Sequence, residues 1–240
     1  RFGLMIRNSE NAAYNYHKQM IGSGSSWSTS DGQQMLWDAE RTPVTMIAYA
    51  PFMSEATPDA SLTVNALTNQ STEENVKSSD FLLMKATVDP EQDLTADGKL
   101  KISLNHAMSK LIIKITVNGT TDASMSKLGD MAINGAVVNA TCDLSAAAPV
   151  VGPAADAVVA TVAPYKGTES CECILPPQKI AEGFSVNFSY DGKLYIWTAK
   201  EAIELEKGVE HTLTLNVNTT VRLAAKVARN WATGQLIDRN

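Results

Sequence analysis

Alternation of apolar and polar residues dominates this chain, whereas the 3.6-residue spacing of an amphipathic helix is scarce. The clearest example covers Phe184–Tyr190, passes through Asp191-Gly192 and resumes over Leu194–Thr198. Asp-Gly between two alternating runs favours a two-residue type I′ β-hairpin, because both turn residues need positive φ. Alternating strands bury one face, so the chain is predicted to form antiparallel sheets that pack face to face.

Further alternating segments recur along the whole chain with turn residues between them. They are Phe2–Ile6, Val44–Ala50, Phe81–Val88, Met131–Val138, Val158–Ala163, Thr212–Asn218 and Val221–Val227. This succession is typical of antiparallel β-sandwiches and differs from the strand–helix alternation of a parallel sheet. The predicted fold class is therefore all-β with little helix.

Helix is expected only in short segments. Ser71–Glu74 resembles a capping box whose helix ends by Ser79, and Asn8–Gln19 has room for one or two turns. Pro and Gly interrupt the alanine-rich Ser145–Pro153, which is predicted to be a loop, and Gly22–Ser26 is predicted to be a flexible loop. The latter lacks the helix and lysine that a phosphate-binding loop needs, so no nucleotide site is predicted there.

The segment Lys99–Val117 indicates two domains. Its apolar residues fall on even positions at first and on odd positions from Leu111 onward. A flat strand keeps one face inward, because a shift by one residue inverts every side chain. The change over Asn105–Lys110 therefore indicates either a passage between two sandwiches, which we favour, or a bulge within one. The predicted domains are residues 1–105 and 106–240.

Composition narrows the classes of function. Hydrophobic residues make up 44% of the chain and charged residues 19%, which is typical of a folded protein. The net charge is −6 and no Lys/Arg cluster is present, so no nucleic-acid partner is predicted. No apolar run approaches the ~18 residues of a membrane span. The chain begins at Arg1 without Met or a signal-type segment, which indicates a fragment, a processed product or the ordered part of a longer chain.

No catalytic, cofactor or metal site is predicted. His17, His106 and His211 lack the i, i+4 spacing of a helical zinc site, and neither HExxH nor GxSxG occurs. Adjacent strand residues point to opposite faces, so His211 and Glu210 do not form a dyad. His106 is assigned a structural, hydrogen-bonding role. The chain is therefore not expected to be an enzyme.

The cysteines and tryptophans are assigned mainly to packing. Cys171 and Cys173 share one strand face without zinc-site spacing, and a disulfide from Cys142 to either of them stays open. The tryptophans either pack in the core or at strand edges, which we favour, or form a carbohydrate platform. They are Trp27, Trp37, Trp197 and Trp231.

Two stretches in the first half of the chain have the form of recognisable motifs. Tyr49 and Pro51 close a predicted strand in the pattern Ala-Tyr-x-Pro. His106, Lys110 and Leu111 belong to the pattern His-Ala-x-x-Lys-Leu at the change of phase.

Three further stretches continue this order. Pro176 and Gln178 form a Pro-Gln segment before the hairpin, and Gly208 precedes an alternating Thr/Leu strand, where His211 stands in place of a usual Tyr. Trp231 follows the last alternating segment. In their order and spacing the five stretches resemble the fimbrillin-like family of Bacteroidales surface proteins, the subunits and anchors of type V pili.

The resemblance implies two tandem transthyretin-like antiparallel β-sandwich domains. It also implies a lipoprotein precursor, with its signal and acylated cysteine ahead of Arg1, that is exported through the periplasm to the outer membrane and cell surface. The membrane is then contacted only through this lipid anchor. Seven residues of the first three motifs would have structural roles: Tyr49, Pro51, His106, Lys110, Leu111, Pro176 and Gln178.

The resemblance further implies assembly with other pilus subunits by β-strand exchange, after a protease that cuts behind an Arg removes a first strand. A strand from the next subunit then adds to the open groove. The candidate donor residues are Val221, Leu223, Ala225, Val227 and Trp231. Alternatively this segment closes its own second sandwich, which we favour. Host or bacterial surface ligands are further candidate partners. The alternative function is a non-polymerising outer-membrane surface lipoprotein that binds glycans.

Overall fold

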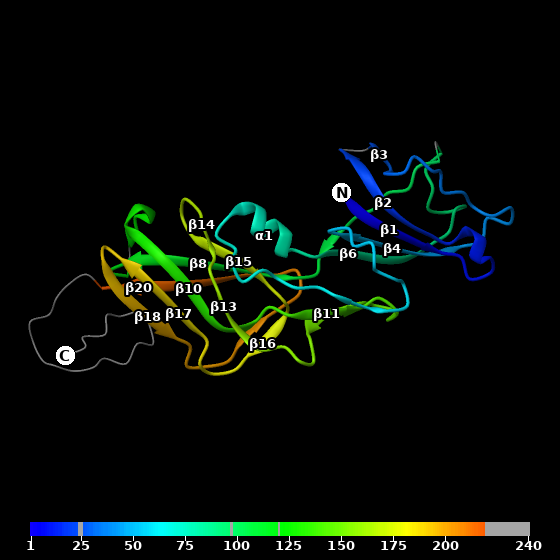
Figure 1. The fold of residues 1–240 in the computed structure, drawn as a ribbon. Coiled ribbons are helices and arrows are strands. Elements are labelled where there is room, and N and C mark those ends of the chain that lie inside the picture. The colour runs from blue at the N-terminus through cyan, green and yellow to red at the C-terminus, as the bar shows by residue number, and fades with distance from the viewer. Residues whose placement is uncertain (24–25, 97, 120, 219–240) are drawn as a thin grey trace, which may run out of the picture. The chain divides into compact units, whose positions relative to one another are not determined.

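The computed structural model describes residues 1–23, 26–96, 98–119 and 121–218 (Figure 1). Strands make up nearly all of the regular structure in these residues, and α1 (Glu73–Ser79) is their one α-helix. The predicted all-β class with little helix is confirmed.

The chain forms two compact units, each assembled from separate stretches of sequence. Unit 1 contains Arg1–Val64, Asp80–Ala107 and Thr141–Val151, and unit 2 contains Asn65–Ser79, Met108–Ala140 and the described residues from Gly152 onward. One passage from unit 1 to unit 2 lies at Ala107–Met108, within the segment where the apolar phase changes. The units differ from the continuous segments 1–105 and 106–240, because residues 65–79 pack in unit 2 and residues 141–151 in unit 1.

Unit 1 is built on a six-stranded antiparallel sheet of order β3-β2-β1-β4-β6-β7. Its strands are β1 (Phe2–Arg7), β2 (Tyr16–Ser23), β3 (Ser26–Thr29), β4 (Val44–Ala50), β6 (Leu82–Val88) and β7 (Asn105–His106). The central strand β4 is buried on both faces, as its run of consecutive apolar residues requires. One face carries an apolar cluster that includes Leu4, Met20 and Met46.

A smaller sheet of order β12-β11-β5 accompanies the large one. Its strands are β5 (Ser61–Thr63), β11 (Ala140–Asp143) and β12 (Val151–Pro153). Lys85 of β6 donates through Nζ to the carbonyl oxygens of Leu144, Ser145 and Ala146, at 2.7, 3.2 and 2.8 Å. Because side chains alternate along a strand, this link lies on the face opposite Met84 and the cluster that it packs against.

Unit 2 contains two larger sheets, of order β14-β15-β8-β20 and β13-β10-β17-β18. The first is made of β8 (Ser109–Val117), β14 (Tyr165–Lys166), β15 (Cys171–Leu175) and β20 (Glu210–Val217), with β9 (Thr121–Asp122) paired to β8. The second is made of β10 (Leu128–Val137), β13 (Val159–Val162), β17 (Ser185–Tyr190) and β18 (Lys193–Thr198). A two-stranded sheet joins β16 (Gln178–Ile180) to β19 (Ile203–Leu205).

The odd-numbered face of β8 forms part of the unit 2 core. Leu111, Ile113 and Ile115 are buried, whereas Lys114 between them is exposed. One pairing of this strand departs from the antiparallel rule, because β20 runs parallel to β8 from Glu210↔Lys110 to Val217↔Val117. Alternation in a single strand does not reveal the direction of its neighbour, so the sequence did not predict this pair.

The predicted hairpin at residues 184–198 is confirmed. Asp191 and Gly192 have φ values of 52° and 76°, as a type I′ turn requires. The segments predicted around residues 2–6, 44–50, 81–88, 131–138, 158–163 and 212–218 are strands as well. The last predicted segment, Val221–Val227, lies outside the described residues.

Four local predictions need correction. The helical turns expected over residues 8–19 reduce to η1 (Ala12–Tyr14), because the alternating residues from Tyr16 onward already belong to β2. Of the expected loop at residues 22–26, Gly22 and Ser23 belong to β2 and Ser26 to β3, and residues 24–25 lie outside the described residues. Residues 151–153 of the expected alanine-rich loop form β12. In α1 the helix cap is Thr72, whose Oγ1 accepts from the amide of Asn75 at 3.2 Å, and not the residue before it. A second 3-10 turn, η2, covers Met125–Lys127.

Candidate functional site

Tyr49 anchors the Ala-Tyr-x-Pro motif inside unit 1. Its hydroxyl donates to the carbonyl oxygen of Met53 at 2.8 Å and lies 2.7 Å from Nε2 of His17 on β2. The hydroxyl proton is thereby used, so Nε2 of His17 carries the proton that Tyr49 accepts. Burial raises the pKa of Tyr49 to about 12 and lowers the pKa of His17, so both groups are neutral near pH 7.

The neighbours of Tyr49 fix the position of its ring. Gly3 lies opposite Tyr49 in the β1–β4 register, and a Cβ atom at Gly3 would lie 2.3 Å from the ring atom Cζ. Pro51 follows β4 after a cis Ala50–Pro51 peptide bond. The motif is thus a packing device, in which a glycine on β1 leaves room for a buried tyrosine on β4.

His106 and Lys110 lie in different units and make different contacts. His106 ends β7, and its Nδ1 lies 2.7 Å from Oδ2 of Asp80 while its side chain is 68% exposed. Lys110 lies at the start of β8, where its Nζ is 2.9 Å from Glu172 and 3.5 Å from Glu210. The hydrogen bond with Glu172 raises the pKa of Lys110. The lysine therefore links the three neighbouring strands β15, β8 and β20 on one face.

Leu111 and Gln178 are further motif residues that lie in unit 2. Leu111 is 2% exposed in the core. Gln178 uses its side-chain amide as a peptide group: Oε1 accepts from the amide of Val137 at 2.9 Å, and Nε2 donates to the carbonyl of Val137 at 2.9 Å. Nε2 also donates to the carbonyl of Pro176, which is buried, at 3.0 Å. Gln178 thereby satisfies the backbone at the end of β10.

A second glutamine with the same role was not identified from the sequence. Gln70 is fully buried, and its side-chain amide pairs with both the N–H and the C=O of Ile174, each at 2.8 Å. Its Nε2 also donates to the carbonyl of Leu67 at 2.8 Å. β14 begins at Tyr165, which pairs with Glu172, so Gln70 replaces the missing strand two residues further along β15.

The three cysteines lie in the core, whereas Trp197 is the buried one among the described tryptophans. All three cysteines are buried and no disulfide joins them, and burial raises the pKa of Cys171 to about 11. Trp197 is 9% exposed, Trp37 is half-buried, and Trp27 is 42% exposed and packs edge-on against Phe2 at 5.0 Å.

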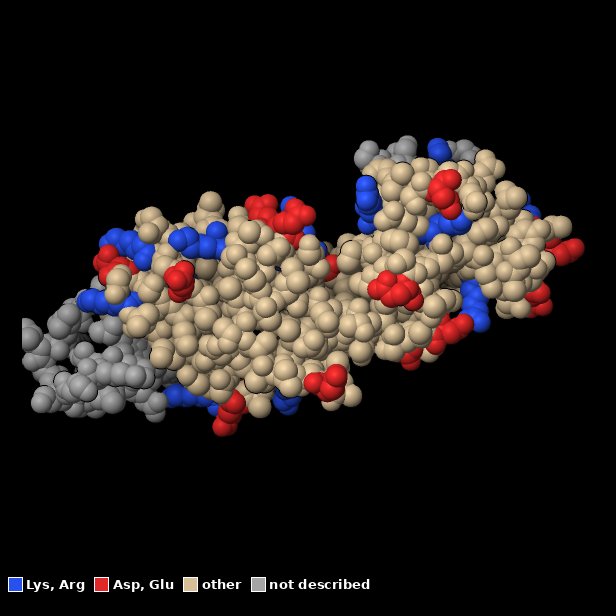
Figure 2. Space-filling view, viewed as in Figure 1, with Lys and Arg blue, Asp and Glu red and all other residues tan. Residues whose placement is uncertain are grey.

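Figure 2 shows Lys and Arg interspersed with Asp and Glu over the face in view. Among the residues that the structure describes, no group of three or more His, Cys, Asp or Glu side chains could hold a metal ion. None of the described helices has the length and apolar character needed to cross a membrane.

Strand β20 leads toward the candidate donor residues, which themselves lie outside the described part of the chain: Val221, Leu223, Ala225, Val227 and Trp231. Within the described residues β20 pairs with β8 alone, so it is an edge strand of its sheet. Its apolar residues Leu213, Leu215 and Val217 alternate with polar ones. Such an edge carries backbone groups on which a further strand can pair.

A comparison with protein families matches residues 2–231 to a family described as fimbrillin-like. The chain belongs to the fimbrillin-like family. The resemblance inferred from the five motifs is therefore confirmed.

Solved structures share the fold of this fimbrillin-like chain. A proposed cell adhesion protein from Bacteroides uniformis ATCC 8492 has a TM-score of 0.68 and 17% identity, over 91% of this chain and 86% of that one. Another from Bacteroides ovatus ATCC 8483 has a TM-score of 0.64 and 16% identity, over 90% and 81%. A third, from Bacteroides thetaiotaomicron VPI-5482, has a TM-score of 0.50 and 15% identity, over 89% and 78%. No curated protein matches the chain.

Proposed function

We propose that this chain is a subunit or adhesin of a cell-surface fimbria and that it joins neighbouring subunits by β-strand exchange. The observation that carries the proposal is its membership of the fimbrillin-like family over nearly its whole length. The all-β fold and the motif residues that pin its strands suit a mechanical and structural role. We assign it no catalytic activity.

The donor in this proposal is the segment Val221–Val227, which follows β20 in the sequence. Strand addition takes its affinity from backbone hydrogen bonds and its specificity from alternate side chains in pockets. Val221, Leu223, Ala225 and Val227 supply one apolar face, and Trp231 supplies an anchor. The acceptor is an open sheet edge of the neighbouring subunit. Within the described residues of this chain, β20 has an edge of that kind.

The proposal includes a location. Export through the periplasm, attachment to the outer membrane by a lipid anchor ahead of Arg1, and display at the cell surface would bring subunits together where a fimbria grows. Other subunits are then the main partners, with host or bacterial surface molecules as ligands of an adhesin.

The test compares two variants of the donor segment, each with two added aspartates on a different face of the strand. Leu223→Asp/Val227→Asp removes the apolar face, whereas Ala224→Asp/Ala228→Asp adds the same charge to the opposite face. We expect the wild type and the second variant to form SDS-resistant oligomers after proteolytic trimming of the precursor, and the first variant to stay monomeric. Equal assembly by both variants, or assembly after deletion of residues 221–240, would refute this donor.

The glycan-binding alternative has one supporting observation, the partial exposure of Trp27. If the protein stays monomeric, binds bacterial or host glycans and loses this binding in Trp27→Ala, the glycan-binding function would replace the fimbrial proposal. Unchanged binding in that variant would remove Trp27 from consideration.

A further inference from the structure

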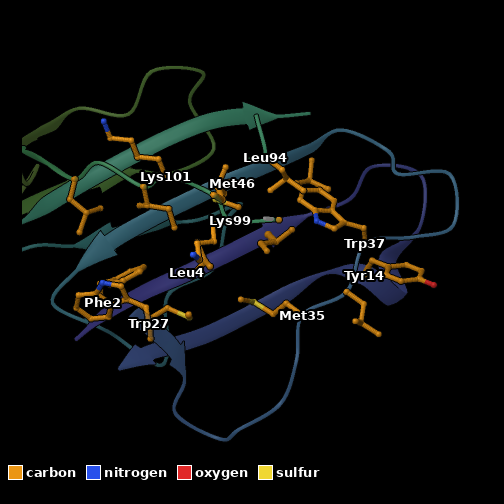
Figure 3. A pocket seen from close by; sticks show the side chains of 18 of the residues that line it. Phe2, Leu4, Tyr14, Trp27, Met35, Trp37, Met46, Leu94, Lys99 and Lys101 are labelled. Carbon is orange, nitrogen blue, oxygen red and sulfur yellow. The ribbon is translucent and has the colours of Figure 1, made fainter. Parts of the chain in front are cut away.

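The two faces of the large sheet in unit 1 are covered in different ways. On the face that carries Leu4 and Met46, the cover leaves a cavity of about 950 Å³ (Figure 3). The opposite face carries Met5 and Ile47, which lie opposite each other in the β1–β4 register and are both buried. This second face is therefore sealed, and its cover includes a segment from a distant part of the sequence.

That segment is residues 141–151, which we call the strap. It belongs to unit 1, although it follows β10 of unit 2 in the sequence. Most of β11 lies in the strap and pairs with the three-residue strand β5, so that Cys142 lies opposite Leu62, and both side chains are buried. Residues 144–150 belong to no strand, so between β11 and β12 the strap depends on contacts other than strand pairing.

One lysine holds the turn that follows β11. Lys85 lies opposite Ile47 in the β4–β6 register, so its side chain points to the sealed face. Its Nζ donates to three consecutive carbonyl oxygens, those of Leu144, Ser145 and Ala146. An ammonium group has three N–H donors, so this turn supplies one acceptor for each of them. Hydrogen bonds from a charged donor are roughly twice as strong as neutral ones.

The turn after β11 is shaped to receive a positive charge. The carboxylate of Asp143 accepts from the amide and from the hydroxyl of Ser145, at 2.9 and 2.6 Å, which bends the chain where the three carbonyls face Lys85. These hydrogen bonds lower the pKa of Asp143, and the charge of Lys85 lowers it further. A carboxylate and three carbonyl dipoles thus lie near a single ammonium group.

We propose that the strap opens as a unit of its own and that the ammonium group of Lys85 holds it closed. When this group leaves the three carbonyls, residues 141–151 detach from the sealed face while unit 2 stays folded. Opening exposes Cys142, which is fully buried in the closed strap, whereas Cys171 and Cys173 stay buried in unit 2. The three thiols therefore distinguish opening of the strap from unfolding of the whole chain. The proposal does not depend on strand exchange, so either can fail without the other.

The experiment measures alkylation of the full chain by iodoacetamide under native conditions, with each cysteine followed by mass spectrometry. Lys85→Met keeps the aliphatic part of the side chain and removes its charge, and Lys101→Met, at an exposed position of unit 1, is the matched control. We expect Lys85→Met to speed alkylation of Cys142 about tenfold or more, the ratio that corresponds to one lost hydrogen bond from a charged group. Cys171 and Cys173 should stay protected, and the control should match the wild type. Unchanged alkylation of Cys142, or equal acceleration at all three cysteines, would overturn the proposal.

A second variant tests the chemistry of this contact. Lys85→Ala removes the outer part of the side chain, which n-propylammonium matches in length and charge. We expect n-propylammonium to slow the alkylation of Cys142 in this variant severalfold, because its three N–H groups can bind the vacated carbonyls. Tetramethylammonium at the same concentration carries the same charge without an N–H donor and should have no effect. Equal effects of the two cations, or no effect of either, would refute the assignment of the three carbonyls as the group that holds the strap closed.

Discussion

Replacing Gln70 by leucine tests whether a side-chain amide stands in for a missing strand in unit 2. Leucine has nearly the same size but leaves the N–H and C=O of Ile174 without their partner. Ile174 is 6% exposed, so water does not readily replace the amide. A buried backbone group without a partner costs about 1–3 kcal/mol, so the two groups together cost about 2–6 kcal/mol. Burial of an apolar side chain in place of an amide offsets part of this cost, and we expect a net loss of about 3 kcal/mol.

The loss is measured as the free energy of unfolding in urea, with hydrogen exchange of β15 as the local readout. The amide of Ile174 should exchange faster in Gln70→Leu, because its acceptor is gone. Gln92→Leu is the control, since Gln92 is exposed in unit 1, and its stability should lie within about 0.5 kcal/mol of the wild type. A Gln70→Leu variant as stable as the control, with unchanged exchange at Ile174, would refute the reasoning.

Gln70→Glu tests the direction in which the free energy of unfolding changes with pH. A protonated glutamic acid can still accept from the amide of Ile174 and donate to its carbonyl, whereas the carboxylate is buried and repelled by that carbonyl. The folded-state pKa of the new side chain should therefore lie above its unfolded value of about 4.3. The variant should be most stable below the unfolded-state pKa, and its free energy of unfolding should fall as the pH rises through the folded-state pKa. A stability that rises instead with pH would contradict the assigned geometry.

Three other outcomes follow from the contacts. Gly3→Ala should lower the free energy of unfolding by about 1–3 kcal/mol, because its Cβ would overlap the ring of Tyr49, whereas Gly152→Ala meets nothing within 4 Å and should leave the melting temperature unchanged. Lys110→Met should lose no more than about 1 kcal/mol, and a double-mutant cycle with Glu172→Gln should show coupling. Because the folded pKa of the lysine is raised, the wild-type advantage should be present below pH ~10.5 and vanish as the pH rises through the raised value. The three buried cysteines should resist a thiol reagent at pH 8 until urea unfolds the protein, and rapid labelling of the native chain would contradict their burial.

Strand positions were predictable because alternation is a local property. Residues 184–190 bury the side chains that their alternation indicates, and the Asp191-Gly192 turn has the positive φ values that its residue types favour. Residues 44–50 form the predicted strand but are buried on both faces. The change of apolar phase at residues 105–110 could also be read from the local sequence. It lies where the chain passes from β7 of unit 1 to β8 of unit 2. The corrected segments, such as residues 16–23, carry weak alternation interrupted by glycine and serine.

Pairing partners were harder to predict, because they depend on residues far apart in the sequence. The parallel alignment of β20 with β8 joins segments about one hundred residues apart, and no pattern within either strand encodes it. Gln70 and Ile174 are likewise 104 residues apart. The sequence around a single glutamine in a polar loop does not indicate that its amide will hydrogen-bond to an unpaired position of a distant strand.

The two glutamines suggest why this fold tolerates short and interrupted strands. β14 is two residues long, and the pairing of β17 with β10 reaches only Ser185↔Asn134, so Ile174 and Val137 would otherwise present backbone groups without partners. An amide side chain offers the same donor and acceptor as a peptide unit, and it does so without the entropy cost of ordering a whole strand. Gln178 lies in the Pro-Gln segment that was identified from the sequence, whereas Gln70 was missed, because its role depends on where β14 begins. If the reasoning holds, lengthening β14 so that it pairs with Ile174 should make Gln70 dispensable, and Gln70→Leu should then cost no more than the exposed control.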